Sequence, residues 1–545
     1  MASLDLNTAV LGLKNARHLL RRSSFAYHQD TISQFSVLTP SQAIDILLTD
    51  PPLILDLPYD PSGDGYWTTS PNLPTSFNDQ NRKASIVSGW WWYNAIHSTT
   101  LKYKLSHFLS TRFTVQKTNG AGSATEFYDY LCLLLFYSYG NYKTLAKKMT
   151  LNNSMLNYLN NTSNSKVAPN ENYAREFLEL FTIGKGAPIA PGNYTNYTEH
   201  DIVQAAKVLT GFKRQSDRSI LDAVTGIPKG NNLFSDHDTS SKTFSSAFNS
   251  TTIQPATDAN GMQNELDDFV EMIFNQSATA QTICRKIYTY FVKSEITPEV
   301  ENDIILPLAS ELLANGYEII PVLRKLLTSL HFYDLDDSNS NDEIIGGLLK
   351  SPIQQLSELC TFLKASIANP TSNPEDFYTT FWDSFAHNSF LRNANMLPFD
   401  PINVAGHPAY YQSPDFDKNW ISASTLTARY RLGESLLTGE NRINGNVDIN
   451  TKINITEVIR NGNIISDPSN PLILTTELCN ALFAQETDPD RILYFMNAFL
   501  LQGNPPIDWV GLWEFYIAAN FVTVVDFRLN SLLTNILKAP ECQMF

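Results

Sequence analysis

The residues best suited to chemistry lie in three polar segments between residues 170 and 244. The first segment carries Arg175, Glu176 and Glu179 within five residues. Carboxylates can bind a cation or transfer protons, and an arginine can orient an anionic group. Their types and spacing therefore predict a site for acid–base or metal-assisted chemistry.

The first segment is expected to be an amphipathic helix. At about 100° per residue, the apolar residues from Tyr173 to Phe181 fill one side of the helix and the charged residues fill the other. Glu171, Arg175 and Glu179 follow one another at a spacing of four, which allows an ion-pair ladder. The charged face then either meets water or faces a pocket, and the helix pattern is compatible with both.

The second segment begins the next expected helix. Thr198 and Asp201 are spaced as in a capping box, with Asp in place of the usual Glu or Gln. Asp201 also falls on the apolar side of this helix, where a buried carboxylate needs a partner. It is either a reciprocal cap or an inward-pointing functional acid.

The third segment supplies an imidazole, a carboxylate and a cation from one long polar loop. His237 and Asp238 are potential metal ligands, and Lys242 could hold an anionic group. Taken alone, such a loop is usually just solvated. The predicted catalytic residues are therefore Arg175, Glu176, Glu179, Asp201, His237 and Lys242, and the predicted ligands of a divalent metal ion are Glu176, Glu179, His237 and Asp238.

The composition excludes several classes of protein. A formal charge of −16 argues against nucleic-acid binding and against adhesion to anionic lipid. The five cysteines are far apart and form neither a disulfide framework nor a zinc ribbon pattern. The sequence shows no signal peptide and no transmembrane segment, which favours a cytoplasmic protein.

Helical periodicity dominates the chain and predicts a mainly α fold. We expect a large multi-helix single body with long loops and at most a small β-hairpin. One helix is expected over 83–113, and a capped helix with a first-turn proline is expected after Thr39. The predicted domains are a helical core, 1–470, with long loops at 55–80, 214–260, 396–420 and 437–470, and a C-terminal helical region, 471–545, packed on that core.

These segments together resemble a family of mainly helical bacterial proteins, the domain of unknown function 1800 family. The hallmark of the family, N-E-N-x-A-R-E-x-x-E-L-F-T-x-G, is met at every fixed position from Asn170 to Gly184. Five further elements occur in order: an A-x-H-L-L-R-R-x-x-F element at Ala16 to Phe25, a His/Arg-Phe element at Arg112 to Phe113, Y-T-E-x-D at Tyr197 to Asp201 with L-T-G-aromatic at Leu209 to Phe212, H-D-x-x-x-K-x-F at His237 to Phe244, and a proline turn at Pro401 to Pro408 before Trp420.

The resemblance raises the expectation of a pocket but supplies no reaction. The end of the chain, Ala539 to Gln543, is similar to Bacteroidota-type members of the family. Many relatives have W-H-N-H-F where this chain has Leu109 to Phe113, so an activity that needs those histidines is doubtful here. The genes of many relatives lie beside genes for proteins of the domain of unknown function 1501 family. The resemblance therefore implies a partner of that family. Export together with such a partner is the alternative to a cytoplasmic location.

Two functional hypotheses follow. The first is an enzyme of hydrolytic or metal-assisted type, in which carboxylates bind a metal or act as base and Arg175 and Lys242 hold an anion. The second is a non-catalytic scaffold or envelope-associated protein that works with the implied partner. In the second case the polar residues form buried ion-pair networks.

Overall fold

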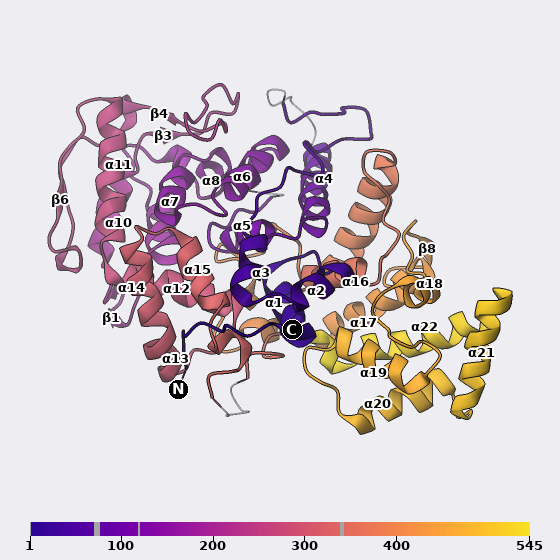
Figure 1. Ribbon diagram of the computed structural model, residues 1–545. Coiled ribbons are helices and arrows are strands. Elements are labelled where there is room, and N and C mark those ends of the chain that lie inside the picture. Colours follow the sequence, from indigo (N-terminus) through magenta and orange to yellow (C-terminus); the bar gives the residue numbers. More distant parts are fainter. Residues whose placement is uncertain (1, 70–76, 118–119, 338–342) are drawn as a thin grey trace.

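The computed structural model describes residues 2–69, 77–117, 120–337 and 343–545. Part of the predicted loop at 55–80 therefore lies outside the described residues. About 56% of the chain is helical and about 5% lies in strands, which confirms the mainly α fold. The described residues form 22 α-helices in one body (Figure 1).

The helices of the N-terminal two thirds form the left and central parts of Figure 1. They are α1 (Gly12–Ser23), α2 (Gln29–Ser36), α3 (Pro40–Leu47), α4 (Phe77–Ile96), α5 (Lys102–Ser110), α6 (Ala124–Phe136), α7 (Tyr142–Thr150), α8 (Asn153–Tyr158), α9 (Glu171–Glu176), α10 (Glu199–Val208), α11 (Ala259–Phe274), α12 (Ser277–Phe291), α13 (Pro298–Val300), α14 (Leu306–Ala314) and α15 (Ile319–Leu327). Two π-helical segments continue α9 and α13, namely η2 (Phe177–Phe181) and η5 (Glu301–Ile305).

The remaining helices lie mostly to the right in Figure 1. They are α16 (Pro352–Phe362), the π-helix η7 (Asp376–Leu391), α17 (Ala423–Thr438), α18 (Ile455–Asn461), α19 (Pro471–Leu482), α20 (Pro489–Phe495), the π-helix η10 (Met496–Leu501), α21 (Pro506–Ala519) and α22 (Thr523–Leu537). Short 3₁₀ turns are η1 (Asn161–Ser163), η3 (Phe234–Asp236), η4 (Ser246–Phe248), η6 (His331–Tyr333), η8 (Pro408–Tyr410), η9 (Phe416–Trp420) and η11 (Pro540–Gln543). The predicted loop at 437–470 therefore contains one helix, α18.

Strands are short and always come in antiparallel pairs. Within the described ranges there are four two-stranded ribbons rather than one hairpin. They are β1 (Pro188–Ala190) with β2 (Asn193–Tyr194), β3 (Phe212–Lys213) with β4 (Asn231–Asn232), β5 (Lys242–Thr243) with β6 (Thr252–Ile253), and β7 (Glu440–Asn441) with β8 (Val447–Asp448). Pairs of this length brace loops and form no layer of their own.

Local signals set several helix ends. Thr39 and Gln42 form a capping box at the start of α3, and Pro40 occupies the first turn as expected. Gly184 has a φ of +73°, and its N–H donates to the carbonyl of Leu178 where the hallmark segment ends. A residue with a Cβ would be strained in this left-handed conformation, which explains the glycine.

The single helix predicted over 83–113 is wrong, because the chain breaks after Ile96. Between α4 and α5, the N–H of Leu101 donates to the carbonyl of Leu47 in α3 at 2.8 Å instead of to a carbonyl of its own helix. The hydroxyl groups of Ser98 and Thr100 also hydrogen-bond to each other there, at 2.9 Å. The break lets α5 turn away and bring Lys104 and His107 into the interior.

The core encloses α4 on all sides from Lys83 to Ile96. Trp90, Trp91 and Trp92 are consecutive, point in different directions, and are all fully buried. Their indole N–H groups donate to the carbonyl of Leu55 and to the hydroxyls of Ser106 and Ser357, respectively. A buried helix of this kind fixes the position of the elements around it.

The C-terminal helices are tied to α1 by buried polar contacts. Arg21 donates hydrogen bonds to the carbonyl oxygens of Ala481 and Phe483 at 2.7 and 3.1 Å. The chain end returns to the centre of the molecule beside α1 (Figure 1). The domain boundary at residue 470 stays a prediction. Among the helices that the structure describes, none combines the length and apolar character of a membrane span.

Candidate functional site

Asp201 acts as a structural cap at the start of α10. Its Oδ2 accepts hydrogen bonds from the backbone N–H of Thr198 at 2.8 Å and from the Thr198 hydroxyl at 2.9 Å. Both carboxylate oxygens also accept from Ser245, one from its N–H and one from its hydroxyl, each at 2.7 Å. The side chain is fully buried, so these bonds leave it no path to a substrate.

His237 and Lys242 belong to a closed interior network built on Glu265 of α11. The Lys242 ammonium donates to both Glu265 oxygens at 2.9 and 2.7 Å. Nδ1 of His237 hydrogen-bonds to the Thr210 carbonyl at 2.8 Å, and its Nε2 lies 3.2 Å from the Glu265 carboxylate without hydrogen-bond geometry. His237 and Lys242 are both 0% exposed, which excludes direct contact with a ligand in this conformation.

The charged face of the hallmark helix is paired at the surface. The Arg175 guanidinium makes a bidentate ion pair with Glu199 at 2.7 and 2.8 Å and also contacts Glu171 at 3.2 Å. Glu179 pairs with Lys185 at 2.5 Å. Glu176 has no such partner among the described residues, and burial together with the charge of Glu179 raises its pKa to about 7.

The predicted metal ligands do not form a cluster in the described part of the chain. Three metal-type ligands within reach of one ion occur there only at Asp60, Asp64 and Asp79. These carboxylates already bind cations, because Arg82 pairs with Asp60 and Asp79, and Lys83 pairs with Asp64 and Asp79. The predicted ligands therefore do not surround a common metal position, and the charges of the three aspartates are already balanced by Arg82 and Lys83.

A different cavity collects side chains from six regions of the sequence. We call it the basic cavity; its volume is about 40 Å³. Half-buried residues such as Ser294 and Phe416 connect it to the surface. Its lining comprises Phe25, Lys104, Arg112, Thr289, Tyr290, Ser294, Leu348, Leu349, Ser351, Ala409, Tyr410, Phe416, Asp417, Trp420 and Phe545. None of the predicted catalytic or metal-binding residues is among them.

Arg112 is a buried cation that pairs with no counter-ion in the described part of the chain. It is 7% exposed, and its guanidinium donates only to the Thr111 hydroxyl at 3.0 Å and the Tyr410 carbonyl at 3.2 Å. Within the described residues, no carboxylate lies in ion-pair contact with it and its Nη1 has no hydrogen-bond partner. Burial lowers its pKa to about 10, so it stays charged at neutral pH.

Lys104 is the second cation of this cavity. It is 4% exposed, donates to Oε1 of Gln354, and lies 4.4 Å from the centre of the Phe25 ring. Burial, reinforced by the charge of Arg22, lowers its pKa to about 7. Close to neutral pH it therefore exists in both protonation states, as a proton-transferring group requires.

Two more buried cations lie near the basic cavity and pair with no Asp or Glu in the part of the chain described. Arg22 donates to the carbonyl of Ile344 and to a main-chain oxygen of the terminal residue Phe545, and its Nε and Nη1 have no hydrogen-bond partner. Lys286 donates to the carbonyl of Leu180 in the hallmark segment, and burial lowers its pKa well below the usual value. The cavity lining has one acidic side chain, Asp417, whose Oδ2 accepts from the N–H of Leu349 at 2.8 Å.

A family model described as a protein of unknown function (DUF1800) matches residues 18–544. The chain belongs to the DUF1800 family. No curated protein and no solved structure matches it.

Family motifs meet at the basic cavity rather than at the hallmark helix. Phe25 ends the first motif, Arg112 begins the second, and Trp420 follows the proline turn. Tyr410 lies two residues after that turn, and Phe545 lies two residues beyond the tail element. These motif positions could have indicated the site from the sequence. Lys104 and Tyr290 could not have been found in this way, because each lies outside the motifs on a helix with an ordinary apolar and polar pattern.

Proposed function

We propose that the basic cavity binds the carboxylate or phosphate group of a small ligand and that Lys104 exchanges a proton with it. The function class that this site suits is an enzyme using acid–base chemistry, of which hydrolysis is one form. In this proposal Arg112 provides the fixed charge and Lys104 the titrating one. The hydroxyl groups of Tyr290, Tyr410 and Ser351 orient the ligand.

The observation that carries the proposal is the burial of Arg112 and Lys104 without carboxylate partners in the described structure. A buried charge costs several kcal/mol unless an opposite charge offsets it. The protein has a net charge of −16, so carboxylates were abundant and these two positions still lack one. In the proposal, a bound anion supplies the negative charge that Arg112 and Lys104 lack.

The test is a calorimetric titration of the purified protein with inorganic phosphate and, separately, with acetate. The variant Arg112→Gln removes the fixed charge but keeps a polar side chain of similar length. The matched control is Arg285→Gln, because Arg285 is paired with Glu301 on the surface of α12 and lines no part of the basic cavity.

We expect at least one anion to bind the unmodified protein and the control equally. Arg112→Gln should weaken that binding about tenfold or more, since losing one charge-assisted hydrogen bond costs roughly 1.5–3 kcal/mol. Binding of neither anion, or equal binding by both variants, would contradict the proposal. Phosphate binding alone indicates a phosphorylated ligand, and acetate binding alone indicates an organic acid.

A second candidate function is a scaffold whose polar motifs hold loops in place. The closed contacts of Lys242 with Glu265 and of Asp201 with Ser245 support it. A partner of the domain of unknown function 1501 family and a divalent metal ion remain proposals from the sequence. Co-purification with such a partner and metal analysis of the purified protein test them.

A further inference from the structure

An apolar surface on α21 lies at the edge of the molecule. Figure 1 shows this helix at the outer edge of the C-terminal region, away from the N-terminal helices. On α21 and the turn after it, the side chains of Ile507, Phe515, Phe521 and Val522 are 69%, 54%, 49% and 42% exposed. The rings of Phe515 and Phe521 contact each other, with their centres 5.8 Å apart. We call these four residues the α21 patch.

A groove begins where the α21 patch ends. Val522 belongs to the patch and also lines this groove, whose volume is about 580 Å³. Ile453 and Val458, from α18 and the segment before it, supply apolar parts of its wall. We call it the α18 groove. A projecting pair of aromatic rings and a hollow therefore adjoin on the surface.

The charges of the two parts are complementary. Lys364 and Lys452 line the α18 groove, and Glu514 lies on α21. All three residues are exposed, and none of their side chains forms an ion pair within the described residues. The two acids of the groove, Glu457 and Asp526, already accept hydrogen bonds from residues of α18. The lysines and Glu514 are therefore available for contacts outside the chain.

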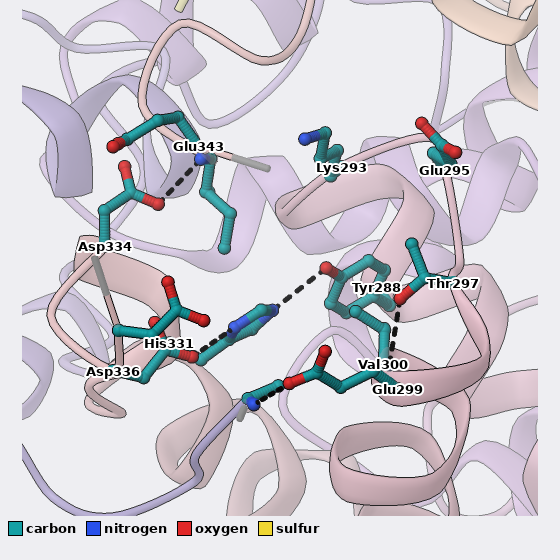
Figure 2. Close-up of a pocket in the computed structure, with 13 residues that line it drawn as sticks. Tyr288, Lys293, Glu295, Thr297, Glu299, Val300, His331, Asp334, Asp336 and Glu343 are labelled. Atoms are coloured by element: carbon teal, nitrogen blue, oxygen red, sulfur yellow. Dashed lines mark hydrogen bonds and ion pairs between the residues drawn. The ribbon is translucent and has the colours of Figure 1, made fainter. Parts of the chain in front are cut away.

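The hollow beside the C-terminal end of α12 is a contrasting surface, because its polar groups bind one another. Nδ1 of His331 lies 2.7 Å from Oδ2 of Asp336, and its Nε2 lies 3.0 Å from the hydroxyl of Tyr288. Figure 2 shows the imidazole between the other two side chains. The same aspartate accepts from the N–H of Ser3 at 3.1 Å. The exposed rings of the α21 patch, by contrast, can leave water only against another surface.

We propose that two copies of the chain associate through these surfaces, with the α21 patch of each copy in the α18 groove of the other. Because patch and groove adjoin at Val522, a two-fold axis near this residue makes both contacts at once. Glu514 of each copy then faces Lys364 and Lys452 of the other copy. Helices that lie on membranes carry Lys or Arg beside their apolar face, and α21 has neither.

The size of the surface sets the strength of this pairing. A buried aromatic side chain covers about 150–250 Å², so the exposed parts of Phe515, Phe521 and Ile507 offer roughly 300 Å². Specific interfaces bury at least about 600 Å² from each partner, and the walls of the groove supply the rest. The edge position of α21 separates the two bodies, which limits the repulsion between their net charges of −16. We therefore expect a weak dimer with a dissociation constant in the micromolar range.

The first experiment is sedimentation velocity of the full chain at concentrations from about 1 to 200 μM. Phe515→Glu places a charge in the middle of the α21 patch. The matched control is Val167→Glu, because Val167 is 87% exposed and lies before α9, outside both surfaces. Melting temperatures at the lowest concentration establish that each variant is folded. We expect the unmodified protein and the control to dimerise equally, and Phe515→Glu to raise the dissociation constant at least about tenfold.

The second experiment reverses charges to test which surfaces meet. Glu514→Lys is one variant, and Lys364→Glu combined with Lys452→Glu is the other. Each variant alone places like charges across the interface and should dimerise less than the unmodified protein. An equimolar mixture of the two places opposite charges at both contacts, so it should form the mixed dimer at least as readily as the unmodified protein dimerises.

A chain that stays monomeric over this range overturns the proposal, and binding of that monomer to phosphatidylcholine vesicles would identify a lipid surface as the occupant instead. The proposal is equally overturned if folded Phe515→Glu dimerises as the control does, or if the two charge variants do not associate when mixed. None of the substituted residues lines the basic cavity, so either result leaves the anion site to its own test.

Discussion

At the residue scale, the candidate cations differ in whether a carboxylate pairs with them. Arg175 and Lys242, the predicted anion-holding residues, are each paired with a glutamate. Arg112 and Lys104, by contrast, have no carboxylate partner in the described structure and line a cavity. A paired cation has little attraction left for a ligand, which is why we propose a function for the second pair and not for the first.

Replacing Lys104 with an uncharged residue should stabilise the protein, by an amount that depends on pH. Its pKa of about 7 lies below the ordinary value of 10.5, so the folded protein disfavours its charged form. That penalty is complete at low pH and shrinks as the pH rises from about 7 towards the unfolded value. In anion-free buffer, Lys104→Met should therefore raise the melting temperature more at about pH 6 than at about pH 9.

Scanning calorimetry at both pH values measures this effect. Lys14→Met serves as the control, because Lys14 is exposed on α1 and its removal should change little at either pH. A gain that is larger at the higher pH would show that Lys104 is not destabilised as a cation in the fold. It would also remove Lys104 as the titrating group of the basic cavity.

At the element scale, side-chain caps and short ribbons hold loops that have little regular structure. The loop after β5 is attached to α10 through Asp201 and Ser245. The ribbon of β5 and β6 is attached to α11 through Lys242 and Glu265. The predicted loop at 214–260 therefore has a fixed position, because its polar side chains bind residues of α10 and α11.

Asp201→Ala should lower the free energy of unfolding by about 3 kcal/mol, since it removes a helix cap and leaves the N–H of the half-buried Ser245 without its acceptor. Urea denaturation followed by circular dichroism measures the loss. Asp303→Ala, in the half-buried segment η5, is the control and should cost far less. A loss below about 0.5 kcal/mol would contradict the structural role and return Asp201 to the functional candidates.

At the scale of the whole molecule, α1 connects regions that are distant in the sequence. Arg21 pairs with Glu358 of α16 at 3.0 Å and donates to two carbonyl groups at the C-terminal end of α19. Arg429 of α17 donates to Gln543 near the chain end at 2.9 Å. The first motif and the tail element thus meet in one buried polar network.

Arg21→Met should destabilise the chain as a unit, by about 3 kcal/mol, because it leaves buried acceptors on α16 and at the C-terminal end of α19 without a donor. In scanning calorimetry we expect one transition, shifted to lower temperature as a whole. Arg431→Met, on the exposed face of α17, is the control. A separate early transition would instead indicate that the region 471–545 unfolds independently of 1–470.

The sequence by itself determined the family, the mainly α class and several helix ends. Those properties depend on local periodicity, caps and ordered motifs, as at Thr39, Asp201 and Gly184. It also placed all the hallmark charges on one side of a helix. It could not predict the break after Ile96, where the N–H of Leu101 bonds to the carbonyl of Leu47, a contact distant in the sequence.

Only the tertiary structure decided which polar residues face a cavity. Arg175 and Arg112 both lie in family motifs. Arg175 pairs with Glu199, whereas Arg112 pairs with no carboxylate in the described chain. Lys104 contacts Gln354, which lies 250 residues further along the chain, and Tyr288 contacts His331, which lies 43 residues further along. Partner and burial depend on such long-range packing, and they decide whether a charge is available to a ligand.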